Sequence, residues 1–100
     1  MTIFLVTTVE KIKEEPTTKL QTFGDRRCVG FFETIEDAMI AVSERLKDKF
    51  YRYCIIEEVK DGLFKRSDNR YIFEWSSKER RYIQIDEPRL IHMVTNFAIG

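Results

Sequence analysis

Five segments of the chain place apolar side chains among polar ones in patterns that are typical of β-strands. Each is rich in β-branched or aromatic residues, and they cover residues 2–9, 26–33, 51–59, 70–76 and 80–85. In the first segment every residue from Ile3 to Val6 is apolar, so apolar side chains point to both faces of the strand. This indicates burial on both faces and an interior position in a sheet. The last two segments are separated only by residues 77–79 and therefore predict a hairpin.

Between the second and third strands the apolar side chains recur at the spacing of a helix. The stripe consists of Ile35, Ala38, Met39, Val42 and Leu46. Thr34 before it is a good N-cap, and the acidic Glu36 and Asp37 suit the positive end of the helix dipole. Because the stripe is one-sided, it predicts an amphipathic helix over about 35–48 that lies on one face of the sheet.

The remaining segments predict connections and a second, shorter helix. The polar residues 11–21, which include Pro16, are expected to form a loop, and residues 22–25 a turn. Asp86, Glu87 and Pro88 are typical of a helix start, and the apolar residues 96–100 are expected to be tied down. The predicted fold is therefore a single α+β domain over 1–100. It has about five mainly antiparallel strands, the main helix on one face and a short C-terminal helix.

The charge balance narrows the function. Lys+Arg and Asp+Glu both number 17, so the formal net charge is zero. This argues against a general polyanion binder but leaves room for a local basic patch. The start of the chain lacks the features of a signal peptide, and no apolar run is long enough to span a membrane. We therefore expect a cytoplasmic protein.

The residues that usually carry chemistry are sparse. Cys28 and Cys54 with the single His92 are too few for a Cys/His zinc site, and both cysteines are expected to be buried thiols. No metal or other cofactor is predicted. Glu57 and Glu58 are adjacent in a strand and point to opposite faces, so they cannot act together on one bond. Because nucleophile and phosphate-loop motifs are also absent, we expect a protein that is not an enzyme.

Binding residues are easier to nominate. Gly24 beside Arg26 and Arg27 could form a small anion site, while Gly30 inside a strand indicates a bulge, a close backbone approach or a ligand contact. Further arginines lie near aromatic residues, which is typical both of protein interfaces and of base-stacking surfaces. The candidate ligand- or partner-binding residues are Gly24, Arg26, Arg27, Arg52, Tyr53, Arg80 and Arg81. The simplest alternative is that the aromatic residues are core and the arginines pair with nearby acids.

The order of several motifs resembles a family of short, uncharacterised proteins of bacteria, phages and mobile elements, especially among Firmicutes. The resemblance rests on Phe4-Leu5-Val6-Thr7-Thr8, Arg27-Cys28-Val29-Gly30-Phe31-Phe32-Glu33-Thr34-Ile35-Glu36-Asp37-Ala38, Tyr51-Arg52-Tyr53-Cys54-Ile55-Ile56-Glu57-Glu58-Val59 with Gly62-Leu63, Tyr71-Ile72-Phe73-Glu74-Trp75, Ile85-Asp86-Glu87-Pro88 and Asn96-Phe97-Ala98-Ile99-Gly100. It implies a genomic setting in which small proteins often bind and block a target. It implies no activity for any residue.

These observations favour a non-enzymatic interaction domain with a protein partner, for example a phage or mobile-element accessory protein that inhibits a host or defence protein. A binder of a nucleotide signal is the first alternative, with Gly24, Arg26 and Arg27 holding phosphate. An RNA or single-stranded DNA module that uses Arg80 and Arg81 is the second. A homodimer is compatible with each of these functions.

Overall fold

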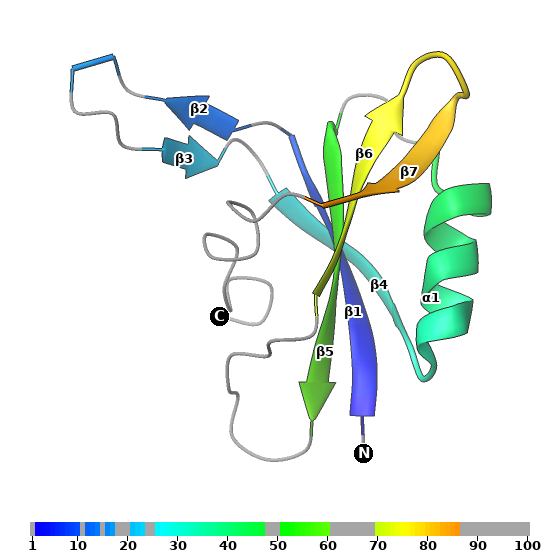
Figure 1. The fold of residues 1–100 in the computed structure, drawn as a ribbon. Coiled ribbons are helices and arrows are strands. Elements are labelled where there is room, and N and C mark those ends of the chain that lie inside the picture. Colours follow the sequence, from blue (N-terminus) through cyan, green and yellow to red (C-terminus); the bar gives the residue numbers. More distant parts are fainter. Residues whose placement is uncertain are drawn as a thin grey trace.

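The computed structural model describes residues 2–10, 12–14, 16–17, 21–23, 26–47, 51–60 and 70–86. They form an open antiparallel sheet of five strands in the order β4-β1-β5-β6-β7, with a helix on one face (Figure 1). The strands are β1 (Thr2–Val9), β4 (Arg26–Phe32), β5 (Tyr53–Lys60), β6 (Arg70–Ser76) and β7 (Arg81–Ile85). The expected α+β class, the antiparallel strands and the single covering helix are confirmed. The expected short C-terminal helix lies outside the described residues.

Strand β1 lies inside the sheet, as its two apolar faces predicted. It pairs antiparallel with β4 on one side and with β5 on the other, so β4 and β5 run in the same direction. Two strands of the same direction need a crossover connection, and the helix makes it. As a result, the start of β4, the start of β5 and the C-terminal end of the helix all lie at one end of the sheet (Figure 1).

The helix begins where its cap predicts and ends earlier than its apolar stripe predicts. The Thr34 hydroxyl accepts a hydrogen bond from the Asp37 N–H at 3.2 Å, and α1 spans Ile35–Ile40. The last turn, η1 (Ala41–Arg45), is wider, because the Leu46 N–H donates to the carbonyl five residues back at 2.9 Å. Leu46 itself is extended and packs on the core, so the prediction of a helix to residue 48 was wrong.

The core lies between the helix and the sheet. It is formed by Val6, Ala38, Val42, Cys54, Ile56, Phe73 and Tyr82. Tyr82 is fully buried, and its hydroxyl donates to the Tyr51 carbonyl at 2.6 Å. Its ring meets that of Trp75 edge-on, with the centroids 5.2 Å apart. The opposite face of the central strands is buried too, through Leu5, Val9, Ile55 and Ile72.

The segment predicted as a loop, residues 11–21, contains regular structure. Strand β2 (Ile12–Glu14) pairs antiparallel with β3 (Gln21–Phe23) in a separate two-stranded sheet. The pair lies between β1 and β4 in the chain and extends their hairpin (Figure 1). The loop prediction is confirmed at Pro16 and Thr17, which form a turn. It was wrong for residues 12–14 and 21, because the two arms of a hairpin are held by backbone pairing, which side-chain polarity does not reveal.

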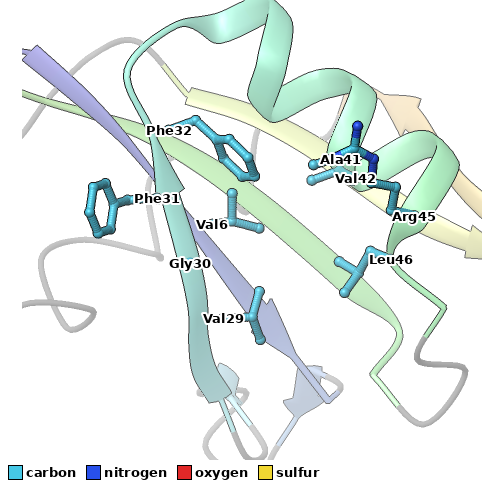
Figure 2. A pocket seen from close by; sticks show the side chains of 9 residues that line it. All are labelled: Val6, Val29, Gly30, Phe31, Phe32, Ala41, Val42, Arg45 and Leu46. Atoms are coloured by element: carbon cyan, nitrogen blue, oxygen red, sulfur yellow. The ribbon is translucent and has the colours of Figure 1, made fainter.

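Gly30 marks an irregularity in β4. The register between β1 and β4 shifts between Val6 and Thr7, so Val6 faces Gly30 and Thr7 faces Cys28. This leaves Val29 as an extra residue beside Gly30 (Figure 2), which confirms the predicted bulge. Chain neighbours aside, no described atom lies within 4 Å of the place that a Cβ would take at Gly30. None of the described residues makes the close backbone approach that was the alternative.

Candidate functional site

The topology separates the charges of this neutral chain. The ends of β1 and β6 and the starts of β4, β5 and β7 lie together, as the pairs Val9↔Arg26, Val9↔Tyr53 and Ser76↔Arg81 show. We call this region the cationic end, and its described cations are Arg26, Arg27, Arg45, Lys47, Arg52, Lys78, Arg80 and Arg81. The described acids Glu33, Glu36, Asp37 and Glu58 lie toward the opposite end, whereas four others, Glu10, Glu44, Glu74 and Glu79, lie among the more numerous cations of the cationic end. The result is a local basic surface on a molecule without net charge.

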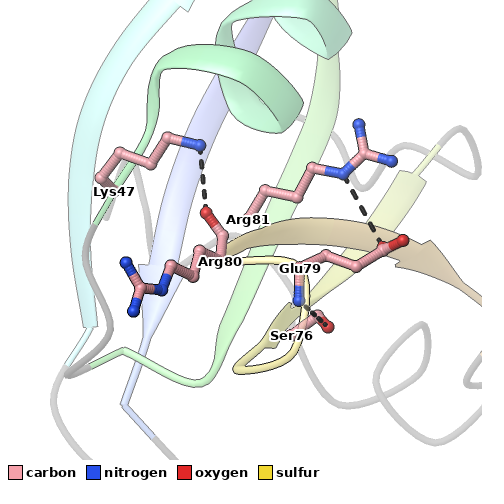
Figure 3. Close-up of polar contacts among 5 residues, drawn as sticks. All are labelled: Lys47, Ser76, Glu79, Arg80 and Arg81. Atoms are coloured by element: carbon pink, nitrogen blue, oxygen red, sulfur yellow. Dashed lines mark hydrogen bonds and ion pairs between the residues drawn. The ribbon is translucent and has the colours of Figure 1, made fainter.

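The turn between β6 and β7 presents part of this surface (Figure 3). The Arg80 N–H donates to the Ser76 carbonyl at 2.7 Å, and the Glu79 N–H donates to the Ser76 hydroxyl at 3.2 Å. Lys47, just after the helix, donates its ammonium group to the Arg80 carbonyl at 3.1 Å. The end of the helix and the turn are therefore joined, and their cations form one continuous group.

Arg80 has a strained backbone. Its φ is 56°, and among the described residues other than glycine it alone has a positive φ. A side chain with a Cβ pays about 1–2 kcal/mol for the left-handed conformation, which glycine adopts freely. Strained positions of this kind are enriched at functional sites. Arg80 therefore combines a strained backbone with an exposed charged side chain at the cationic end.

Arg52 is held in a defined position beside Tyr53. Its Nε and Nη2 both lie 2.8 Å from Oε2 of Glu74 on the neighbouring strand. Its guanidinium also stands 5.7 Å from the centre of the Tyr53 ring. The pKa of Arg52 is raised, first by its side-chain hydrogen bond with Tyr53 and then by the charge of Glu74. Glu74 and Tyr53 thus both contact the guanidinium of Arg52 and favour its charged form.

Arg27 is held in a similar way. Its guanidinium carbon lies 4.8 Å from the centre of the Tyr51 ring, and its carbonyl accepts a hydrogen bond from the Thr8 hydroxyl at 3.3 Å. Tyr51 is in turn tied to the core through the bond from Tyr82. A chain of contacts therefore runs from the core to the surface cation.

Most of the predicted binding residues meet at the cationic end. Arg26, Arg27, Arg52 and Tyr53 occupy the starts of β4 and β5, and Arg80 and Arg81 occupy the β6–β7 turn. Gly24 lies outside the described residues. The sequence prediction missed Arg45 and Lys47 at the end of the helix. In the sequence they are visible only as basic residues at the end of the helical segment. Which end of the sheet that helix end reaches depends on the direction of the crossover.

Several carboxylates of the described residues lie in ion pairs. Among the described residues, no group of three or more His, Cys, Asp or Glu is placed to hold a metal ion. Glu57 is buried and bonded to Arg70, with Oε2 and Nε 2.8 Å apart, while the half-buried Glu58 lies 3.6 Å from the Lys60 ammonium. At the cationic end Glu74 is bound by Arg52, and Glu79 lies 3.8 Å from Nε of Arg81.

The two cysteines differ, contrary to the expectation that both are buried. Cys54 is buried in the core, and burial raises the pKa of its thiol above the usual range. Cys28 is exposed, because it lies beside the bulge on the outermost strand. The expectation failed because the apolar run around Cys28 belongs to an edge strand, whose position in the sheet the sequence does not state.

This difference predicts selective thiol chemistry. In the native protein we expect a disulfide reagent such as Ellman's reagent to titrate Cys28 alone, since Cys54 is neither accessible nor ionised. After denaturation both thiols should react. The measurement is the absorbance of released thionitrobenzoate, with a Cys28→Ser variant as control. Rapid reaction of that variant under native conditions would contradict the assignment.

No protein-family model, curated protein or solved structure matches the chain. None of the helices in the described part of the chain has the length and apolar character that crossing a membrane requires.

Proposed function

We propose that this protein is a non-enzymatic interaction domain that binds an acidic surface of another protein through its cationic end. The observation that carries the proposal is the separation of charge, since a neutral chain gathers most of its described cations at one end of its sheet. Several of these cations are positioned in advance, as Arg52 is by Glu74 and Tyr53. Arginine and tyrosine held in place lose little conformational entropy on binding and are typical interface anchors.

The aromatic residues favour a protein partner over a nucleotide or a nucleic acid. Stacking of bases needs open aromatic faces. The rings of Tyr51 and Tyr53 lie against Arg27 and Arg52, and Tyr82 is buried. Nucleotide binding and RNA or single-stranded DNA binding remain the alternatives that the test must separate.

The biological setting is part of the same proposal. The order of sequence motifs resembles short proteins of phages and mobile elements, and it supports an accessory protein that inhibits a host or defence protein. Such a target would be met in the cytoplasm. This part of the proposal rests on the resemblance alone, whereas the binding surface rests on the geometry.

The test is a comparative capture experiment from bacterial lysate. Three baits are used: the unchanged protein, an Arg80→Glu/Arg81→Glu variant, and a control with Glu36→Lys and Asp37→Lys in the first turn of the helix, at the opposite end. We expect one set of proteins to be retained by the unchanged protein and by the control but lost from the first variant. Retention should weaken as salt rises, because exposed charges are screened beyond about 8 Å at physiological ionic strength.

Two outcomes would overturn the proposal. One is equal retention of the same proteins by all three baits, which would place binding elsewhere on the molecule. The other is loss of retention after nuclease treatment, or a thermal shift with mononucleotides, which would support the nucleic-acid or nucleotide alternative. Circular dichroism of each variant checks that the fold is intact.

A further inference from the structure

Strand β4 is an outer strand whose middle is apolar and exposed. Among the strands that the structure describes, it is the last one on its side of the sheet. Val29 is 40% exposed and Phe31 63% exposed, and Cys28 between the arginines and Val29 is exposed as well. Outer strands offer unpaired backbone groups to other strands, and proteins usually protect them with charged side chains. Here the charges stand only at the start of the strand, at Arg26 and Arg27, and no strand of the described residues pairs with its outer edge.

The charges at the two ends of β4 have opposite signs, so they are complementary when two β4 strands pair antiparallel. The strand begins with Arg26 and is followed by the exposed Glu33. In an antiparallel pair of two β4 strands, the start of one strand lies beside the end of the other. Arg26 of one copy would then lie beside Glu33 of the second. Segregated charge, which a neutral monomer does not need, becomes attractive in this arrangement.

We propose that two copies of the chain pair through β4, antiparallel, about a two-fold axis between Val29 and Gly30. This register places Arg26 opposite Glu33, Cys28 opposite Phe31, and Val29 opposite Gly30. Residues opposite each other in an antiparallel pair point to the same face. Cys28 and Phe31 meet that condition, since they pair with Thr7 and Leu5 on the face away from the helix.

The bulge supplies room at the centre of this register. Val29 and Gly30 both line a pocket of about 270 Å³ on the helix side of β4, together with Val42, Arg45 and Leu46 (Figure 2). Chain neighbours aside, no described atom lies within 4 Å of a Cβ position at Gly30. The space beside Gly30 can therefore receive Val29 of the second copy. Phe31 points away from the helix (Figure 2) and would cover the other face of the pair.

The dimer goes beyond the proposed function and does not depend on it. Arg52, Arg80 and Arg81 lie outside the β4 register, so the surface that they form stays open in the dimer. Loss of dimerisation and loss of partner capture can therefore be observed separately.

The first experiment is a charge swap read by sedimentation velocity over a concentration series. We expect the unchanged protein to dimerise and Arg26→Glu or Glu33→Arg to weaken the dimer about tenfold or more, because each creates two like-charge contacts across the axis. The double variant Arg26→Glu/Glu33→Arg should regain the dimer. An Arg52→Glu variant, outside the register, is the matched control and should dimerise normally.

The second experiment tests the register by cross-linking. Opposite Cα atoms in antiparallel strands are about 4.5–5.5 Å apart, within the range of a disulfide. A Phe31→Cys variant should thus form a disulfide-linked dimer with Cys28 of the second copy under mild oxidation. The same change in a Cys28→Ser background should not, since the two introduced thiols would lie several residues apart along the paired strands.

A monomer at every concentration would overturn the proposal and leave β4 to a strand from a different protein. A dimer that is insensitive to both single charge changes, or a Phe31→Cys variant that does not cross-link, would equally overturn this register.

Discussion

Replacing Arg70 by methionine is expected to lower the free energy of unfolding by about 3–5 kcal/mol. The side chain of Arg70 is 1% exposed and that of its partner Glu57 is 7% exposed, and their Nε and Oε2 atoms are 2.8 Å apart. Methionine keeps much of the apolar volume but removes the cation. The buried carboxylate of Glu57 then loses its main compensation, which is far more costly than losing an ion pair on the surface. Urea unfolding followed by circular dichroism measures the change.

The matched control replaces both members of the pair. A Glu57→Leu/Arg70→Met variant buries no charge at this place, so it should unfold at nearly the same urea concentration as the unchanged protein or at a higher one. The double-mutant cycle separates the cost of an unpaired charge from the cost of altered packing. A loss of less than about 1 kcal/mol in Arg70→Met alone would contradict the burial of the pair.

This pair also illustrates what the sequence could predict. Neighbouring strand residues point to opposite faces, so the adjacent Glu57 and Glu58 were separable from the sequence, and one of them meets an arginine. The partner was not predictable, because Glu57 reaches Arg70 only through the pairing of β5 with β6. Strand positions and the Thr34 cap follow from local chemistry. The end of the helix does not follow from local chemistry, because Leu46 packs on the core although its backbone is extended and no longer helical.

In the candidate site, too, the residue types were predictable from the sequence and their arrangement was not. Arg26, Arg27, Arg52, Tyr53, Arg80 and Arg81 were nominated as residue types, and the strand order brings them to one end. Zero net charge concealed this, since the overall charge contains no information about its position. The added cations, Arg45 and Lys47, reach the site because the helix crosses β1 and returns to the end where β4 starts. The direction of the helix and the order of the strands are properties of the tertiary structure, which a local sequence pattern does not specify.

Arg80 should give the most informative single substitution at the site, because its effects on stability and on binding are expected to have opposite signs. Arg80→Gly relieves the cost of a Cβ at a φ of 56°. Glycine also increases the entropy of the unfolded chain, which offsets part of the gain. The net expectation is a stability increase of about 0.5–1 kcal/mol. Retention of the captured proteins should fall at the same time, because the guanidinium is gone.

Two further variants separate strain from charge. Arg80→Asn removes the same charge but has a side chain that tolerates the left-handed region, so its stability should lie between those of arginine and glycine. Lys78→Gly removes a charge from a turn position where φ is not positive, and it should destabilise slightly or leave stability unchanged. Thermal and urea unfolding measure stability, and the capture assay measures binding. If Arg80→Gly gains stability and keeps full retention, the strain at Arg80 serves no binding role. If it loses stability, the turn needs the arginine itself, and the guanidinium acts in folding rather than at the interface.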